Sequence, residues 1–379
     1  MTFFENNTKQ IPSGFSKILY LNWPVVILIF SIAAIGFIML YSVAGGSWTP
    51  WVEPQLKRFF VGMVALLVIA MCPIWFWKNI AALMYVVSVI LLIAVEFFGA
   101  SGMGAQRWLD LGFIRIQPSE LTKITTIVFL AAYYDWLDIT KVSRPFWVLI
   151  PIIIILLPVS LVITQPDLGT ALLILCGGGG LMFLAGVHWV YFAGVVVSSS
   201  GLIAAILKSR ETDWALLREY QYHRIDTFLD PASDPMGTGY HITQSKIALG
   251  SGGLNGRGFM QGTQSQLNFL PEKHTDFIFT TLAEEFGFIG GVSVLGMYCL
   301  VVVFCMISAM NNNDRFSSLL SMGIGLTFFL YFAPNMAMVM GYAPIVGVPL
   351  PLISYGGSSM LVLLGAFGLM QSAHVHKMR

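Results

Sequence analysis

Charged residues are scarce in this sequence of 379 residues. Asp, Glu, Lys and Arg together make up only 10% of the chain, whereas 56% of the residues are hydrophobic. The mean hydropathy is +0.78. An ordinary soluble domain is about one quarter charged. The scarcity therefore excludes an ordinary soluble surface and indicates a chain whose main solvent is lipid.

Several common kinds of functional site are also missing. The four cysteines lie in or beside apolar runs without metal-ligand spacing, which favours a packing role. The net charge of +1 says nothing about nucleic acid, and the sequence has no basic run that would suggest it as a partner. No internal repeat is visible, which weakens an inverted-repeat transporter. The glycines at 250, 252, 253, 256 and 258 fit neither the dinucleotide fingerprint nor the P-loop. They indicate ordinary turns or backbone that approaches an anion.

Long apolar runs make up most of the chain. Most of them approach or exceed the ~20 residues that a helix needs to cross a ~30 Å hydrocarbon core. We count ten, at 18–42, 56–76, 79–98, 120–134, 146–164, 169–187, 189–207, 277–309, 317–340 and 353–374. The first lacks a cleavage site and is followed by nine more, so it indicates a retained helix. The sequence predicts an all-α polytopic membrane protein with about ten transmembrane helices, in a single domain over 1–379.

Lys and Arg are unevenly divided between the two sides of the predicted membrane. An even number of spans places both termini on one side, whose short segments hold eight basic residues: Lys9, Lys17, Lys78, Lys141, Arg144, Arg315, Lys377 and Arg379. The opposite short loops hold four: Lys57, Arg58, Arg107 and Arg115. Because basic residues are enriched in cytoplasmic loops, we expect cytoplasmic termini at 1–17 and 375–379. The large loop at 208–276, between spans seven and eight, is then extracytoplasmic.

Charged side chains cluster near the start of span four. Glu120 and Lys123 lie three residues apart on one helical face. They either form an ion pair near the interface or direct one side chain into an inner cavity. Asp167, in the tight hairpin between spans five and six, either caps span six or pairs with a cation such as Lys123 or Arg107. We predict that Glu120, Lys123 and Asp167 form one buried or half-buried charge group.

A second cluster lies at the start of span eight and contains Lys273, His274, Asp276, Glu284 and Glu285. Charge beside hydrocarbon costs ~2.5–3.5 kcal/mol per residue, so the cluster calls for a functional or a pairing explanation. Asp276 stands where an N-cap residue would stand. If the helix begins there, Glu284 lies on the same face. Two carboxylates with basic neighbours suit either proton abstraction or divalent-metal binding.

Proline marks the chain between spans nine and ten. Pro344, Pro349 and Pro351 exclude a regular helix there. Non-helical backbone at membrane depth is tolerated only where it is buried in protein or lines a wet cavity, so we expect this segment to wall a cavity. The glycines at 102, 104 and 112, before span four, indicate an irregular outer loop.

Five segments, read in chain order, resemble the SEDS family of polytopic proteins for shape, elongation, division and sporulation. They are AQRWLDLGFIRIQPSELTKI, TQPDLGTALL, YHITQSKIALGSGGLNGRG, GTQSQLNFLPEKHTDFIFTTLAEEFG and GVPLPLISYGGSSM. The resemblance covers about 18–374, and the motifs are specific when taken together. The segments FLPEKHTDFIF and QPSELTK are most similar to those of the elongation members of the family.

The resemblance implies a peptidoglycan glycosyltransferase of the bacterial cytoplasmic (inner) membrane that serves cell elongation and cell shape. Such an enzyme polymerises lipid II outside the membrane with inversion, making a β-1,4 linkage and releasing undecaprenyl diphosphate. The implied partners are lipid II, the nascent glycan strand, membrane lipid, a class B penicillin-binding protein and other elongation-complex proteins, with no nucleic acid.

The resemblance also implies roles for single residues. Asp276 matches the essential aspartate of the family, which makes it the candidate general base, with Glu284 supporting it. A departing diphosphate needs positive charge. The candidate cations are Arg107, Lys123, Arg224, Lys246, Arg257 and Lys273. The chemistry also allows a divalent cation, Mg²⁺ or Mn²⁺, for which spacing defines no ligands.

Two other functions stay open at this point. A lipid II flippase would need charged groups along a path through both leaflets, whereas the ionisable residues here concentrate in the predicted outer half. A scaffold that only positions a penicillin-binding protein would not need Asp276 at all.

Overall fold

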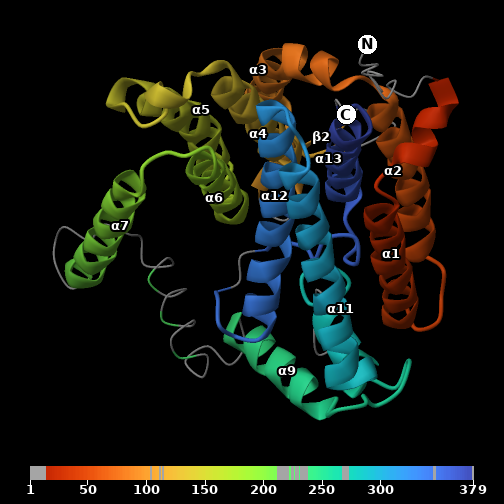
Figure 1. Cartoon of the computed structure of the whole chain (residues 1–379). Helices are drawn as coiled ribbons and strands as arrows, with labels where there is room; N and C mark the ends of the chain where they lie inside the picture. The colour runs from red at the N-terminus through yellow and green to blue at the C-terminus, as the bar shows by residue number, and fades with distance from the viewer. Residues whose placement is uncertain are drawn as a thin grey trace.

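The computed structural model describes residues 14–102, 105–110, 112, 115–210, 222, 226, 230, 238–266, 273–344 and 347–377. In this part of the chain most of the long helices run between two ends of the molecule (Figure 1). The first described residues, before α1, and the C-terminal end of α13 lie at one end, and helix α9 lies at the other. This arrangement agrees with an even number of crossings.

The predicted spans are all helices in the structure. The helices and short 3₁₀ segments are η1 (Gly14–Tyr20), α1 (Trp23–Val43), α2 (Val52–Met71), α3 (Ile74–Phe98), α4 (Pro118–Trp136), η2 (Ile139–Lys141), α5 (Pro145–Thr164), α6 (Leu168–Leu184), α7 (Trp189–Ser209), α9 (Thr238–Ser251), α10 (Thr263–Gln266), α11 (Ile278–Met310), α12 (Arg315–Val339) and α13 (Gly357–Val375). Helices α1 to α7 and α11 to α13 correspond to the ten apolar runs. The all-α polytopic class is therefore confirmed.

Eight of these helices are long and apolar enough to cross a membrane. Helix α6 is apolar but has 17 residues. Helix α4, with 19 residues, is the exception in composition, because most of its side chains are buried against other helices instead of facing lipid. A helix surrounded by protein can carry polar residues that a lipid-facing helix cannot. This explains why the apolar run at 120–134 is the shortest of the ten.

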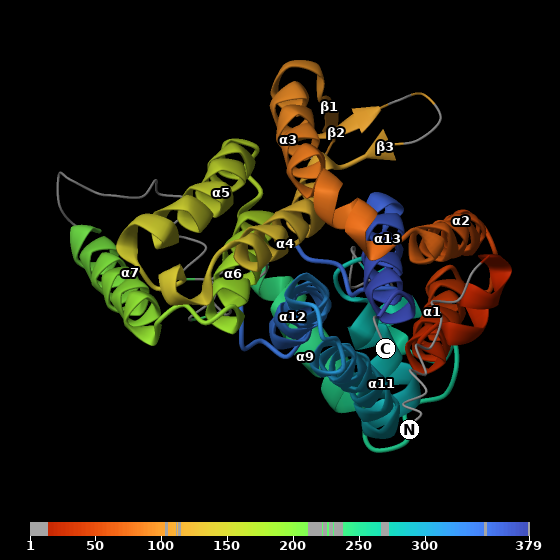
Figure 2. The same cartoon turned by 45° about the horizontal axis from the view of Figure 1, so that its top comes forward.

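The segment before α4 contains a small sheet. Strands β1 (Ala100–Gly102), β2 (Ala105–Asp110) and β3 (Arg115–Ile116) pair antiparallel in the order β1-β2-β3, beside α3 (Figure 2). The expectation of an irregular loop was therefore wrong. Gly112 has φ +84° and its N–H donates to Oδ1 of Asp110 at 2.9 Å, so it serves a turn between paired strands.

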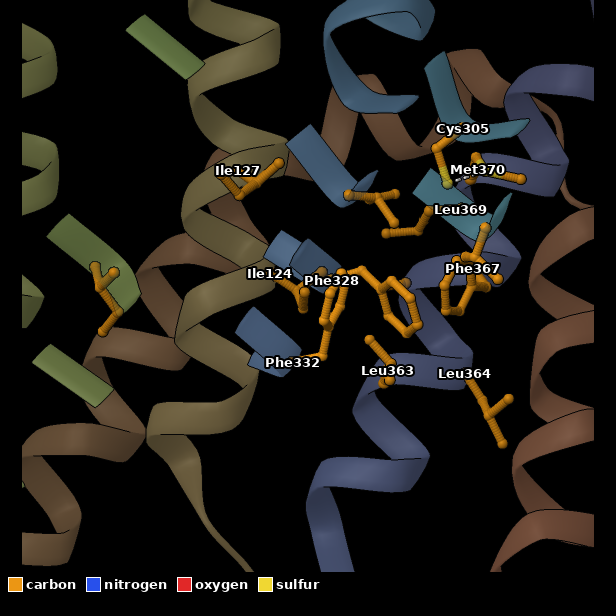
Figure 3. Close-up of a cluster of buried hydrophobic side chains, with 14 of the residues drawn as sticks. Ile124, Ile127, Cys305, Phe328, Phe332, Leu363, Leu364, Phe367, Leu369 and Met370 are labelled. Carbon is orange, nitrogen blue, oxygen red and sulfur yellow. Dashed lines mark hydrogen bonds between the residues drawn. The ribbon is translucent and has the colours of Figure 1, made fainter. Parts of the chain in front are cut away.

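Aromatic and aliphatic side chains from α4, α12 and α13 form the centre of the core (Figure 3). Phe328 and Phe367 meet edge to face, with ring centroids 5.4 Å apart. Tyr298 of α11 stacks on Phe332 at 4.9 Å, and its hydroxyl donates to the carbonyl of Pro351 at 2.6 Å. The core therefore anchors the proline-rich segment that precedes α13.

Candidate active site

Asp276 lies in a turn directly before α11. The helix begins at Ile278, and Phe277 occupies the N-cap position without a side-chain capping hydrogen bond. The alternative in which Asp276 caps this helix was therefore wrong. Asp276 is half-buried, in a turn over residues 273–277.

The backbone around Asp276 is held by three donors. The carbonyls of residues 274, 275 and 276 accept, in that order, from the N–H of Tyr355, from Oγ of Ser354 and from Nδ2 of Asn335. The first and the last of these bonds are both 2.9 Å long. Because each of these carbonyls is bound from outside the helix, the turn that carries the Asp276 side chain is fixed by tertiary contacts.

Two of those donors come from the non-helical segment 347–356. Its backbone includes Gly347 at φ +70° and the buried Leu352 at φ +65°. A Cβ built on Gly347 would lie 3.8 Å from Oδ2 of Asp276, so the carboxylate lies close to this backbone. A small cavity beside the segment is lined by Tyr331, Pro349, Leu350, Pro351, Ser354 and Ser359, among others. The prediction that this segment walls a cavity agrees with these contacts.

Aromatic rings pack beside the same turn. Trp51 stacks on His274 with centroids 4.0 Å apart, and Tyr355 meets Trp51 edge to face at 5.0 Å. The guanidinium carbon of Arg58 lies 4.9 Å from the centroid of the Tyr355 ring. Nη1 of Arg58 is buried and has no hydrogen-bond partner. The site thus receives a cation from the start of α2 that sequence reasoning had counted only as a loop charge.

Lys273 brings a second cation to the turn, three residues before Asp276. Burial lowers the pKa of the Lys273 ammonium below its usual range, because desolvation penalises the charged form. An anion bound beside it would offset this penalty.

Helix α11 is broken at Gly287, about three turns after Asp276, and backbone hydrogen bonds from the glycine-rich segment replace the helical ones there. Gly287 has φ +69° and ψ −164°, a conformation that is essentially restricted to glycine. The N–H groups of Arg257 and Gly258 donate to the carbonyls of Glu284 and Glu285, each at 3.0 Å. In return, the N–H groups of 288 and 289 donate to the carbonyls of 253 and 254, at 2.9 and 3.2 Å. We call residues 252–258 and their contacts with 284–289 the glycine clasp.

The glycine clasp decides between the two interpretations of the glycine cluster. Gly252 and Gly256 come so close to α11 that a Cβ on either would lie 2.1 Å from a carbonyl oxygen of that helix. The N–H groups of residues 256, 257 and 258 are all used within the clasp. The alternative in which these N–H groups bind an anion was therefore wrong. The glycines serve turns and the close approach to α11.

We expect Gly287→Ala to destabilise the protein. Its backbone conformation alone costs ~1–3 kcal/mol for a residue with a side chain. In addition, a Cβ at this position would lie 2.3 Å from the backbone N of Gly256. Thermal unfolding of the detergent-purified protein measures the loss. Gly296→Ala, in the same helix with open space around the Cβ, is the control. Equal stability of the two variants would contradict the role of the clasp.

Glu284 is turned toward α10. Its Oε1 accepts from Oγ1 of Thr263 at 3.1 Å and from the N–H of Gln264 at 3.0 Å. Its neighbour Glu285 is also buried and accepts from Oγ of Ser42 in α1. The shared helical face with Asp276 that was expected for Glu284 is therefore not formed, and the supporting role of Glu284 stays a prediction. The helix begins after Asp276, and Glu284 joins α10 to α11.

Glu120 and Lys123 form a buried ion pair in α4. The ammonium lies 2.7 Å from Oε1 of Glu120, and both side chains are at most 5% exposed. The Lys123 ammonium also lies 4.2 Å from the ring centroid of Tyr331, whose hydroxyl donates to Oε2 of Glu120. The pair faces α12 inside the protein, and Lys123 is enclosed by these two partners.

Asp167 meets two of the expected alternatives at once, because it caps a helix and also has a cation nearby. It caps α6 by accepting from the N–H of Thr170 at 3.2 Å. Its ionic neighbour in the described part of the chain is Arg107, at 3.9 Å, and not Lys123. Arg107 also donates to the carbonyls of Gln165 and Pro166. The predicted charge group therefore divides into two pairs, and Arg107 anchors β2 to the turn between α5 and α6.

The remaining predicted cations are spread over different places. Lys246 of α9 lies across Gly341 at the end of α12, where a Cβ would be 2.1 Å from its Cε. Arg257 belongs to the glycine clasp and donates to Oγ1 of Thr263 at 3.1 Å. Arg224 lies outside the described residues. Among the residues that the structure does describe, no group of three or more His, Cys, Asp or Glu side chains could hold a metal ion.

Sequence reasoning missed three contributors to the site: Trp51, Arg58 and Asn335. The first two lie near the start of α2 and reach residue 274 only through stacking and Tyr355. Asn335 is a buried amide side chain in α12, whose other buried polar residues are Ser317, Ser321 and Thr327. A buried polar side chain in a membrane helix is itself a signal of function or pairing, and it could have been noticed.

Comparisons with known proteins point to one family. The family described as cell cycle proteins, which covers FtsW, RodA and SpoVE, matches residues 22–379. The peptidoglycan glycosyltransferase MrdB of Escherichia coli K12 is 39% identical over 358 residues, which is 94% of each chain. A probable peptidoglycan glycosyltransferase FtsW of Escherichia coli O6:H1 is 37% identical, over 89% of this chain and 81% of that one.

Solved structures share the fold. A chain from a peptidoglycan synthase complex that coordinates polymerization and crosslinking is 28% identical, with a TM-score of 0.79 over 93% of this chain and 97% of that one. The rod shape determining protein RodA of Thermus thermophilus is 25% identical, with a TM-score of 0.70 over 95% and 98%. These similarities cover nearly the whole chain.

Proposed function

The chain belongs to the FtsW, RodA and SpoVE family, also called SEDS, and we propose that it polymerises lipid II with Asp276 as the general base. It is a peptidoglycan glycosyltransferase of the RodA type, as the 39% identity to MrdB over 94% of both chains indicates. The observation that carries the assignment of the base is the turn at 273–277, where one half-buried carboxylate lies three residues after Lys273 and before the N-cap residue of α11.

The reaction defines what the base must do. The 4-hydroxyl of the acceptor GlcNAc attacks the anomeric carbon of a MurNAc, and the C–O bond to undecaprenyl diphosphate breaks with inversion. The hydroxyl proton passes to a carboxylate, and the electron pair of the broken bond leaves on the diphosphate. Proton transfer to a well-placed base contributes ~10²–10⁴-fold to the rate. Asp276 supplies that carboxylate, and its backbone is held from three sides.

The departing diphosphate requires positive charge at the same turn. We propose Lys273 for this role because it lies three residues from Asp276, and Arg58 because its Nη1 is buried and without a partner. Lys246, Arg257 and Arg224 stay candidates for binding the diphosphate at positions farther from this turn. A divalent cation, Mg²⁺ or Mn²⁺, would be bound through the phosphates and at most one or two carboxylates, as Mg²⁺ commonly is.

The partner proposal follows from a structural neighbour. That neighbour belongs to a peptidoglycan synthase complex in which polymerization and crosslinking are coordinated. We propose that this chain works with a class B penicillin-binding protein, which would crosslink the strands, and with other elongation-complex proteins. The nascent glycan strand and the surrounding membrane lipid complete the set of partners.

We propose an extracytoplasmic active site with both termini in the cytoplasm. The glycine clasp and residue 311 lie at opposite ends of α11, whose residues 287–310 span about 36 Å at ~1.5 Å per residue. We expect that Asn255→Cys, in a cysteine-free background, reacts with an impermeant maleimide in spheroplasts and that Asn311→Cys does not. The reverse pattern would contradict the proposed orientation.

The function is tested with labelled lipid II. The purified protein, together with its transpeptidase, should make glycan polymer in detergent, where no membrane separates two compartments. Transport of lipid II across vesicles without any polymer would favour the flippase alternative. Polymer made only by the transpeptidase partner would favour the scaffold.

A further inference from the structure

Asn335 joins the two segments that form the candidate site. It lies in α12 directly after Pro334 and is 1% exposed. Its Nδ2 donates to the carbonyl of Asp276 at 2.9 Å and to the carbonyl of Val348 at 2.7 Å. One amide group therefore ties the turn before α11 to the segment that precedes α13, and holds both on α12.

The geometry of an amide suits this position. An asparagine NH₂ carries two protons in one plane, so a single nitrogen can bind two carbonyls at the same time. The two carbonyl contacts also define which terminal atom is nitrogen. Oδ1 of Asn335 is buried and has no hydrogen-bond partner. A buried, unpaired acceptor is unfavourable for stability. Its presence indicates that the two donated bonds matter for more than core packing.

The contact acts on the residue that needs exact placement. The Asp276 carboxylate lies on the same residue whose carbonyl Asn335 holds, and its Oδ2 lies close to Gly347, one residue before Val348. Moving a reacting group by ~1 Å can cost ~10²-fold in rate. Neither carbonyl belongs to a regular helix, so no helical N–H would replace Asn335 as a donor.

We propose that Asn335 is a positioning residue, which fixes the Asp276 carboxylate against the 347–356 segment at the distance that proton transfer requires. This inference rests on the proposed function of Asp276. Asn335 acts through Asp276 and the Val348 segment and does not itself touch the reacting atoms. Ser354 supports the same arrangement from the other side, because its Oγ donates to Thr275 and accepts from the N–H of Leu350 at 2.8 Å.

The test is Asn335→Leu, which keeps similar volume and removes both donors. We expect kcat of lipid II polymerisation to fall ~10–100-fold, while KM stays within about twofold of the wild-type value. Ser321→Ala is the matched control, because Ser321 is buried in α12 but bonds only the carbonyl of Ser317 in its own helix. The control should keep its kcat within about twofold.

A second pair of variants covers the case in which Asn335→Leu does not fold. Ser354→Ala removes the bond to Thr275 and should lower kcat about tenfold with KM little changed. Ser354→Thr keeps the hydroxyl and should restore most of the rate. If neither Asn335→Leu nor Ser354→Ala lowers kcat more than the Ser321→Ala control, the positioning role is wrong. A rise in KM with unchanged kcat would contradict it as well.

The assignment of the base is tested separately. Asp276→Asn keeps the carbonyl that Asn335 binds and removes only the carboxylate. If Asp276→Asn polymerises normally, the proposed base is wrong, whatever Asn335 does. If Asp276→Asn is inactive while Asn335→Leu keeps its full kcat, the base stands and only the positioning role fails.

Discussion

Asp276→Asn should make no measurable glycan polymer while it accumulates normally in membranes and still binds its transpeptidase. Asn has nearly the shape of Asp but cannot accept the proton of the acceptor hydroxyl, so we expect kcat to fall by ~10²–10⁴. The structure separates this effect from misfolding. Phe277, and not Asp276, occupies the N-cap position, and Asn335 binds the backbone carbonyl of residue 276, which the substitution leaves in place. Polymerisation of labelled lipid II measures the rate.

The control for that substitution is Asp110→Asn. Asp110 is an exposed aspartate of β2 that binds Arg115 at 2.9 Å. We expect its polymerisation rate to stay within about twofold of the wild type. If Asp276→Asn works within a few-fold of the wild-type rate, Asp276 is not the base. Glu284 is then a poor substitute, because its carboxylate is bound by α10.

The helices could be predicted from the sequence because lipid imposes a local rule. Every backbone polar group in hydrocarbon must be bonded within its own segment, so each apolar run of ~20 residues becomes a helix. The break in α11 and the sheet before α4 are different. The break in α11 depends on hydrogen bonds with residues 252–258, and the sheet depends on strand pairing between residues 100 and 116. No local sequence pattern predicts either contact.

The site could be predicted only in part, for the same reason. Asp276 and Lys273 are neighbours in the sequence, so their cluster was visible as charge beside an apolar run. Asn335, Trp51 and Arg58 reach the same turn from α12 and from the chain around the start of α2. Glu284 was placed wrongly because helical spacing was counted from Asp276, whereas the helix begins at Ile278. Tertiary packing decides such positions.

Lys123→Ala should lower both the amount of folded protein and its stability. The substitution leaves Glu120 as a buried carboxylate with Tyr331 as its remaining partner, and breaking a buried pair from one side costs ~3–5 kcal/mol. Thermal unfolding in detergent and the yield of monodisperse protein measure the effect. Polymerisation activity should fall in proportion to the folded fraction, because Lys123 is enclosed by Glu120 and Tyr331.

Lys57→Ala provides the matched control for Lys123→Ala. Lys57 binds Glu53 at 2.6 Å, a distance close to that of the buried pair, but the Lys57 side chain is 73% exposed. Water solvates Glu53 after the substitution, so we expect almost no change in unfolding temperature. A neutral double variant, Glu120→Gln with Lys123→Met, should recover most of the lost stability, because no buried charge is left uncompensated. If Lys123→Ala unfolds at the wild-type temperature but loses polymerisation, the pair is not structural, and Lys123 belongs among the groups that bind the diphosphate.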